Sequence, residues 1–265
     1  MILGKTYFNG TENEKLYLGN NLIYSGVNID FVISVKTDNS GTSNNNQFTI
    51  PTVAGNLYNV TTSDGQILNG NTDDLTITFP SAGTYDVNIS GDFQRILFNS
   101  QGDKDKLLDI KSWGSIAWTS MAHAFRACNS LGTISATDAP DLTSNFNGDA
   151  SFMFQASQYF NGDIGHWDSS QITNLSNAFA YSSLNTNLSL WDINQVTNFG
   201  DFARNLTFST TNYDAILIGW AGQIPLSYNG ILIFGSSVYT LGGAAATARA
   251  ALVSDVGGVS DGGGI

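Results

Sequence analysis

The sequence predicts a mainly β fold with short helices, made of an N-terminal hairpin, a β-sandwich and a short solenoid of stacked coils. Between residues 28 and 100, short runs alternate apolar and polar residues, which is the period of β-strands. Further on, a 24-residue phrase recurs, as WDSSQITNLSNAFA from Trp167 and WDINQVTNFGDFAR from Trp191. Repeats of this length are typical of solenoids, whose coils bury their apolar faces by stacking.

Residues 1–27 are expected to form an attachment segment. Leu16, Leu18, Leu22 and Tyr24 surround the sequence Gly19-Asn20-Asn21, a pattern that predicts two short strands joined by a tight turn. Because an isolated hairpin is only marginally stable in water, we expect it to pack on the sandwich or on another protein subunit.

Residues 28–100 are expected to form the β-sandwich. The alternation predicts about six or seven strands, and the clearest runs are 31–35, 48–50, 58–60, 75–79, 85–89 and 96–98. The polar loop at 39–45 has no apolar side chain to pack, so we expect it to be exposed.

Residues 101–210 are expected to form the solenoid, connected through 102–106 without a flexible linker. A further copy, WGSIAWTSMAHAFRAC, begins at Trp113, and a degenerate copy precedes Trp167, so the repeats indicate about four coils. We expect the Ile/Val-Thr-Asn-Leu segments to be strands, with a helical or 3₁₀ turn after them at 176–181 and 200–205. Asn174 and Asn198 should hydrogen-bond backbone groups at the strand ends. The last strand of the sandwich should cover the first coil.

Residues 211–265 are expected to cap the far end of the stack. YDAILIGWA at 213–221 predicts a helix with Ile216, Leu217 and Trp220 towards the core. A last strand is expected at 231–234 and an Ala-rich helix at 243–252, ending near Ser254-Asp255. The Gly-rich tail at 257–264 is expected to be loosely ordered.

The repeats resemble a known family. FMFQASQYFNGDIGHWDSSQITNLSNAFA is similar to the repeat of BspA-type leucine-rich-repeat surface proteins. FVISVKTDNSGTSNNNQFTIPT and SAGTYDVNISGDFQRILFN resemble an immunoglobulin-like sandwich of the PKD type, which commonly precedes such repeats, while TTNYDAILIGWA and SDGGG resemble their closing segment. At 61–65 the chain has TTSDG, where related modules often have a WGDG-like turn, and the role of that motif is therefore not carried over.

Charge and hydropathy exclude several classes of function. The chain has a net charge of −12, from 22 acidic and 10 basic residues, and such a charge repels nucleic acids and anionic lipid surfaces. No run approaches the roughly 18 apolar residues of a membrane-spanning helix, and the N-terminus does not resemble a secretory signal. We therefore expect neither nucleic-acid binding nor membrane insertion.

The resemblance implies display on a surface, and the missing signal then favours a bacteriophage virion. EKLYLGNNLIYSG resembles the openings of phage structural proteins. We expect a non-enzymatic fibre, spike or decorating subunit that contacts other virion proteins through residues 1–27, attaches to host or environmental glycans or proteins, and could form a homo-oligomer. The alternatives are a bacterial cell-surface adhesin of the same repeat family and a glycan depolymerase.

Two pairs of repeat residues have both a structural and a functional interpretation. Trp167 and Trp191 could stack on sugar rings, or could be core residues whose indole N–H meets a coil carbonyl. Asp168 and Asp192 could be the paired carboxylates of a glycosidase, or could cap the turns that follow them. The structural interpretation is favoured for both pairs, so no catalytic residue is assigned and the ligand-binding residues stay open.

Metal, cofactor and nucleophile sites are not expected. Asp73-Asp74 and Asp103-x-Asp105 could hold Ca²⁺ but lack a complete loop spacing, so we interpret them as solvated loop charges. Cys128 is the single cysteine and is interpreted as a buried apolar side chain. His123 and His166 lie in different coils without a ligand-spaced partner. No nucleotide-binding or catalytic-triad fingerprint is present.

Overall fold

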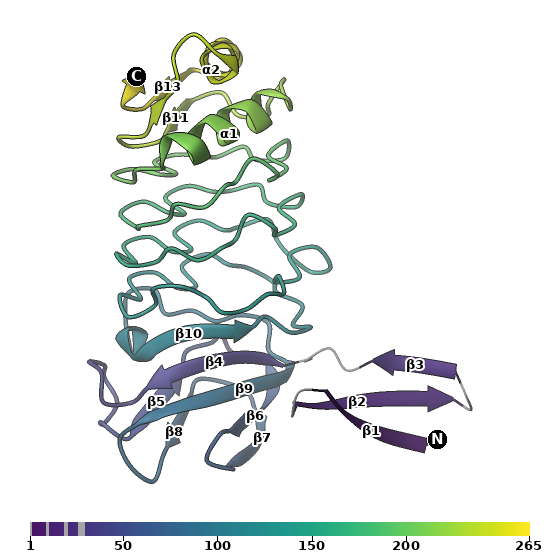
Figure 1. Ribbon diagram of the computed structural model, residues 1–265. Helices are drawn as coiled ribbons and strands as arrows, with labels where there is room; N and C mark the ends of the chain where they lie inside the picture. Colours follow the sequence, from purple (N-terminus) through teal and green to yellow (C-terminus); the bar gives the residue numbers. More distant parts are fainter. Residues whose placement is uncertain (1, 9–10, 19–20, 26–29) are drawn as a thin grey trace.

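The computed structural model describes residues 2–8, 11–18, 21–25 and 30–265, with side chains described for 30–265. The described chain is mainly β, as predicted, and its two α-helices are α1 (Thr210–Ala221) and α2 (Ala244–Asp255). The N-terminal sheet and the β-sandwich lie at one end, a stack of coils forms the middle, and both helices lie at the other end (Figure 1). Neither of these helices has the length and apolar character needed to cross a membrane.

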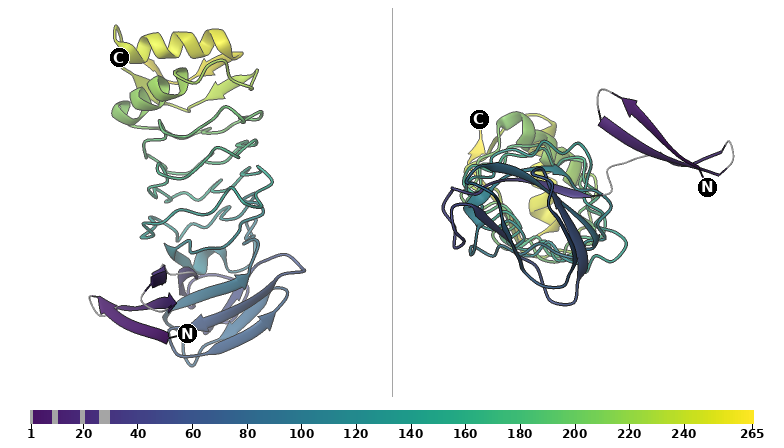
Figure 2. Two further views of the ribbon diagram at one scale, coloured as in Figure 1. Left: turned by 90° about the vertical axis from the view of Figure 1, so that its right-hand side faces the viewer. Right: turned by 90° about the horizontal axis from the view of Figure 1, so that it is seen from below.

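The N-terminal segment is a three-stranded antiparallel sheet. Its strands are β1 (Ile2–Phe8), β2 (Thr11–Leu18) and β3 (Asn21–Ser25), in the order β1-β2-β3. The predicted hairpin corresponds to β2 and β3, in which Leu18 pairs with Asn21, while Gly19 and Asn20 of its turn lie outside the described residues. In Figures 1 and 2 this sheet stands to the side of the sandwich.

The sandwich consists of a five-stranded antiparallel sheet, in the order β10-β4-β9-β6-β7, and the antiparallel pair β5-β8. Phe31, Phe48, Tyr58 and Ile89 are completely buried in its core. The bounds of its strands are β4 (Phe31–Lys36), β5 (Gln47–Ile50), β6 (Leu57–Thr62), β7 (Ile67–Asn71), β8 (Leu75–Thr78), β9 (Thr84–Asp92) and β10 (Leu107–Ser112).

Two details of the sandwich differ from the prediction. Strand β7 has the sequence ILNGN, and it was not predicted because its two apolar residues are adjacent and do not alternate with polar ones. Residues 96–98 are not a strand, because the Phe98 N–H donates to Ala124 O at 3.0 Å and so joins the coils. The TTSDG segment forms the turn between β6 and β7, where the Gly65 N–H donates to Thr62 O at 2.9 Å.

The sandwich and the coils share a strand. After the 3₁₀ turn η1 (Lys104–Lys106), β10 pairs antiparallel with β4, with Leu107 opposite Val35 and Ile110 opposite Ile33. The first coil is therefore covered from two sides of the sandwich. Strand β4 pairs with β10, and the segment expected to be the last strand, 96–98, contacts the coil through the Phe98 N–H, as predicted, although it is not a strand. The connection is short, as predicted, and the edge of β4 is covered by pairing.

Successive repeats lie above one another and are joined by parallel backbone hydrogen bonds (Figures 1 and 2). In each coil, alternate N–H groups donate to the next coil. The ladder starts with Phe98 donating to Ala124 and ends with Ala203 donating to Ile233. Between them, the donor-to-acceptor pairs include His123 to Ser151, Phe125 to Met153, Phe152 to Ser176, Phe154 to Ala178, Asn177 to Gly200 and Phe179 to Phe202, at 2.8–3.1 Å.

The predicted helical turns are instead chains of tight turns with left-handed residues. Each coil has two residues of positive φ, four positions apart, and they are His123 and Ala127, Phe152 and Ala156, Asn177 and Tyr181, and Asp201 and Asn205. A helix would use every interior N–H within its own segment. Here every second N–H points to the neighbouring coil, so the prediction of a helical turn is wrong. The other N–H groups make bonds of the 3₁₀ type to the third residue before them, as from Ala178 to Leu175 O at 3.1 Å, but no continuous 3₁₀ helix forms. The predicted strands are reduced to single parallel bridges that join Asp149, Asn174 and Asn198.

Aromatic side chains fill the interior of the stack. The Trp113 ring lies 5.0 Å from that of Trp167, and Phe154 lies 5.2 Å from Phe125 and 6.1 Å from Phe179. Both tryptophans are buried. Contacts of this kind between rings stabilise by about 0.5–1.5 kcal/mol beyond the burial of their surface.

The C-terminal cap contains α1, α2 and two parallel strand pairs. Ile216, Leu217 and Trp220 on α1 are buried, as predicted. The strands are β11 (Ile231–Ile233), β12 (Val238–Tyr239), β13 (Gly258–Ser260) and β14 (Gly263–Gly264), and they pair as β11-β13 and β12-β14. The expected last strand at 231–234 is therefore followed by three more.

The expectation of a loosely ordered tail is wrong. The Asp261 carboxylate accepts from Arg249 Nε at 2.7 Å and from the Tyr213 hydroxyl at 2.6 Å. Glycine is required beside it, because a Cβ at Gly262 would lie 2.6 Å from Ser236 O. The glycines here allow the backbone to approach its neighbours closely.

Candidate functional site

Two polar cavities open where the sandwich meets the first coils. The larger, about 470 Å³, is lined by residues 38–40, Asp105, Asn129, Ser130 and Tyr159, and we call it the junction cleft. The smaller, about 320 Å³, includes Thr49, Asp74 and Asp103 in its lining. The loop between β4 and β5 contributes to both.

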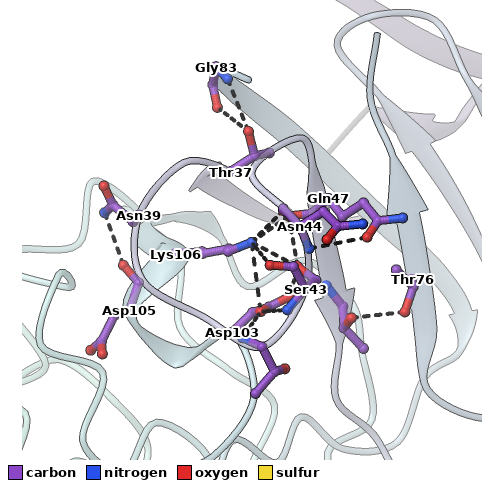
Figure 3. Close-up of polar contacts among 12 residues, drawn as sticks. Thr37, Asn39, Ser43, Asn44, Gln47, Thr76, Gly83, Asp103, Asp105 and Lys106 are labelled. Atoms are coloured by element: carbon purple, nitrogen blue, oxygen red, sulfur yellow. Dashed lines mark hydrogen bonds and ion pairs between the residues drawn. The ribbon is translucent and has the colours of Figure 1, made fainter. Parts of the chain in front are cut away.

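A buried ion pair fixes this loop in place (Figure 3). Lys106 Nζ lies 3.8 Å from Asp103 Oδ1, and both side chains are almost completely buried. The ammonium donates to the carbonyl oxygens of Ser43, Asn44 and Gln47 at 2.9–3.1 Å. A lysine therefore provides the positive charge around which the loop carbonyls gather.

The Asp103 carboxylate holds the same loop by accepting hydrogen bonds. It accepts from the backbone N–H groups of Thr42 at 2.9 Å, Ser43 at 3.0 Å and Thr49 at 2.7 Å. Burial raises the pKa of Asp103, but the bonds from Ser43 and Thr49 and the charge of Lys106 outweigh it, so the pKa lies below its usual value. Burial disfavours the charged form of Lys106 as well, and for an ammonium group this lowers the pKa.

The interpretation of Asp103 as a solvated charge is therefore wrong. Its exposed fraction is 1%, and its oxygens already accept hydrogen bonds from the loop. Asp105 is partly exposed and accepts from the Asn129 N–H at 3.2 Å. Within the described residues, no group of three or more acidic, histidine or cysteine side chains is arranged to hold a metal ion.

The polar lining of the junction cleft comes from both parts of the fold. Asn39 Nδ2 donates to Asp105 O at 3.0 Å and to Ser130 Oγ at 3.3 Å (Figure 3 shows the first bond). Asp38 is exposed and lies 3.5 Å from Lys36. The cleft therefore presents carboxylate and amide groups whose backbone positions are fixed by the anchored loop.

An aromatic ring completes the cleft. Tyr159 has an exposed fraction of 68%, and it follows the turn at Ala156 in the coil above Asn129. A flat apolar face beside fixed hydrogen-bonding groups suits a ligand with one apolar face and several hydroxyl groups. A pyranose ring has this character.

The two repeat tryptophans do not reach the surface. Trp167 and Trp191 are buried, and Trp191 Nε1 donates to Ile164 O at 3.0 Å. Both are core residues, as predicted, so the sugar-stacking interpretation is wrong. The predicted indole bond is made by Trp191 but not by Trp167, whose Nε1 is buried without a hydrogen-bond partner among the described residues. The indole of Trp220 makes the corresponding bond to Leu188 O at 3.0 Å.

The repeat aspartates and asparagines bind local backbone groups. Asp168 accepts from the Ser170 N–H, and Asp192 from the Asn194 N–H, both at 3.0 Å, so the capping interpretation is confirmed. Asn198 Oδ1 accepts from the Gly200 N–H at 3.0 Å, and Asn174 Oδ1 from Ser176 N–H at 3.1 Å, as predicted.

The other candidates lie apart from one another. Cys128 is buried, as predicted, and burial raises the pKa of its thiol. Asp74 accepts from the Thr52 N–H at 2.8 Å. His123 stacks on Phe152 with 4.6 Å between ring centres, whereas His166 is exposed.

Sequence reasoning missed both Lys106 and Tyr159. The KDK sequence at 104–106 reads as a solvated linker, and only the return of a loop sixty residues earlier makes its last lysine a buried residue. Tyr159 lies in the degenerate copy, just after its turn. The corresponding positions of the next coil are occupied by Ser183 and Leu184. The departure of Tyr159 from the repeat was the available signal.

Comparison with known proteins identifies the repeat region only. Residues 119–215, rather more than a third of the chain, match a family described as Mycoplasma protein of unknown function, DUF285. No curated protein and no solved structure matched the chain. The matched residues include the copies at Trp167 and Trp191, on which the resemblance to BspA-type repeats rests.

Proposed function

We propose that this protein is a non-enzymatic attachment protein that contacts glycans on a host or environmental surface through the junction cleft. Its coils are a leucine-rich-repeat solenoid of the BspA type, and its sandwich is of the PKD type. The observation that carries the proposal is the exposed ring of Tyr159 beside the polar groups of Asp38, Asn39 and Asp105. Weak binding at each cleft is multiplied where many copies are displayed together.

The particle that carries the protein is proposed to be a bacteriophage virion. The resemblance of EKLYLGNNLIYSG to phage structural proteins supports this, and the segment corresponds to β2 and β3. In this arrangement the three-stranded sheet contacts other virion proteins and the coils face outward as part of a fibre, spike or decorating subunit.

A second candidate, a bacterial cell-surface adhesin, is favoured by one observation. The family that matches residues 119–215 is described as a Mycoplasma protein, which supports a cellular relative for the repeats. The same cleft would serve in either setting, so the two candidates differ only in what carries the chain.

Glycan binding is tested with purified protein on an array of bacterial surface glycans. Tyr159→Ala should abolish binding to every glycan on the array that the natural protein binds. Tyr181→Ala is the matched control, because Tyr181 is exposed and lies in the next coil but does not line the cleft. Retention of full binding by the Tyr159 variant defeats the role of the cleft. Release of reducing ends from a bound glycan defeats the non-enzymatic assignment and supports a depolymerase.

The carrier is tested separately. Mass spectrometry of purified phage particles should find this chain, and the genes beside its own should encode capsid, portal or tail proteins. Particles without the chain, or neighbouring genes for cell-wall proteins, would support the adhesin.

A further inference from the structure

Two arginines stand out because no described carboxylate pairs with them; Arg95 lies just before the coils and Arg126 lies on them. Within residues 30–265, each of the other lysines and arginines has a carboxylate oxygen within 4.0 Å. Among residues 30–265, Arg95 and Arg126 have none, although the chain has more than twice as many acidic as basic residues. In so acidic a protein, two cations without a directly paired carboxylate make this place locally basic, although the charge of Asp149 still acts on Arg95 and His123.

The two arginines lie close to the same histidine. The pKa of His123 is lowered by burial and by the positive charges of Arg126 and Arg95, against an opposing effect of Asp149. Each guanidinium makes one hydrogen bond that helps to hold it in place: Arg95 Nη2 donates to the backbone Ala122 O at 2.7 Å, and Arg126 Nη1 donates to the side-chain Asn99 Oδ1 at 3.5 Å. The result is a local positive field on a negatively charged molecule.

Polar atoms without partners gather at the same place. Of the described side chains, seven have a buried polar atom without a hydrogen-bond partner, and three of these atoms are indole nitrogens. The remaining four belong to neighbouring residues of this region, namely Arg95 Nε, His123 Nδ1, Arg126 Nε and Gln155 Oε1. Unsatisfied buried polar groups are costly, so a polar ligand or bound water that pairs with these four atoms would be stabilised here.

An aromatic ring lies in the middle of the cluster. Phe152 is partly exposed, the His123 ring stacks on it at 4.6 Å, and the Arg126 guanidinium lies 5.3 Å from its centre. The cluster therefore combines guanidinium groups, which match a carboxylate in a two-bonded arrangement, with a flat ring and the amide of Gln155. The net charge of −12 opposes densely charged nucleic acids, which favours a saccharide with separated carboxylates.

We propose that Arg95, His123, Arg126, Phe152 and Gln155 form a binding site for the carboxylate of an acidic saccharide. Arg126 donates to the carboxylate while the sugar ring rests against Phe152. None of these residues lines the junction cleft, so the inference stands whether or not the cleft binds glycans.

The test is isothermal titration of the full chain with trigalacturonic acid and with neutral galactotriose. The acidic trisaccharide should bind at least about tenfold more tightly than the neutral one, and added salt should weaken it. Arg126→Gln should reduce its affinity about tenfold, as expected for the loss of one charge-assisted hydrogen bond. Arg204→Gln is the matched control, because Arg204 lies on the coils but is paired with Asp201 at 3.2 Å; this variant should bind normally.

Several results would overturn the proposal. Equal binding of the acidic and neutral trisaccharides excludes a carboxylate site, and equal losses in the two arginine variants indicate general charge attraction. Inorganic phosphate, or an acidic peptide of equal charge, that binds as tightly as the trisaccharide excludes a saccharide site. Tyr159→Ala must leave this affinity unchanged, which separates the site from the junction cleft. Circular dichroism melting checks that the Arg126 variant is folded.

Discussion

Lys106 Nζ lies 3.8 Å from the Asp103 carboxylate in the buried seam between the sandwich and the first coil. The lysine belongs to the turn that leads into the coils, and the carbonyls that it binds belong to the sandwich. The pair thus joins the two parts of the fold and fixes one wall of the junction cleft.

Replacement of Lys106 should destabilise the protein strongly. Lys106→Met leaves the buried Asp103 carboxylate without its ammonium, which costs about 3–5 kcal/mol of unfolding free energy, measured by urea denaturation. Lys111→Met is the control, because its ion pair with Asp86 is exposed and such pairs contribute about 0–1 kcal/mol. Equal losses in the two variants would show that the buried pair does not stabilise the seam.

Acid should weaken the fold through Asp103. Its pKa is lower in the folded than in the unfolded chain, so the folded state holds its proton less tightly. The stabilisation is complete above the unfolded value of about 3.9 and is lost as the pH falls through the folded pKa. Urea midpoints measured from neutral pH downward should show this decrease. In Asp103→Asn the decrease should be smaller, and an identical decrease would assign it to other groups.

The asparagine ladder should contribute to stability at each coil. Asn174→Leu and Asn198→Leu remove the acceptors of the Ser176 and Gly200 N–H groups, so each should cost about 1–3 kcal/mol of unfolding free energy. Gln195→Leu, on an exposed side chain of the same coil, is the control for added apolar surface. Unchanged melting temperatures in both asparagine variants would contradict the prediction.

The left-handed residues should respond to glycine in the opposite way from their neighbours. Ala156 has φ of +57°, a conformation that costs a residue with a Cβ about 1–2 kcal/mol. Ala156→Gly should therefore raise the unfolding free energy by up to about 1 kcal/mol. Ala178→Gly, at a buried position outside the left-handed set, should lower it by about 1 kcal/mol. Calorimetric melting of both variants distinguishes the signs.

The glycine-rich tail should be needed to cover the strand edges of the C-terminal cap. Removal of residues 257–265 deletes β13 and β14 and exposes the edge of β11. Exposed strand edges pair with other chains, so the shortened protein should melt at a lower temperature and form oligomers on size-exclusion chromatography. A monomer with an unchanged melting temperature would restore the original expectation of a loose tail.

The sequence predicted the parts of the fold that depend on periodic apolar residues. Trp113 and Trp167 are core residues, and Ile216 and Trp220 face the core of the cap, because hydrophobic spacing decides which side chains are buried. Asn174 and Asn198 were also predicted correctly, since their contacts are local.

The sequence could not predict features that depend on distant partners. Asp103 and Asp261 are separated by more than ten residues from Thr49 and Tyr213, which bind them. The left-handed turns were hidden because Ala156 has no sequence feature of a positive φ. The arginine cluster draws on Arg95 before the coils and Gln155 within them, so no single motif contains it.

The backbone ladder has one more consequence. Each coil presents to the next the same pattern of donors and acceptors, from Phe98 at one end to Ile233 at the other. If a whole copy were gained or lost, the sandwich and the C-terminal cap would still hydrogen-bond to the same kind of coil. The distance between them would change by about 4.8 Å. The number of copies therefore sets the length of the molecule, and evolution can change that length without altering the sandwich or the cap.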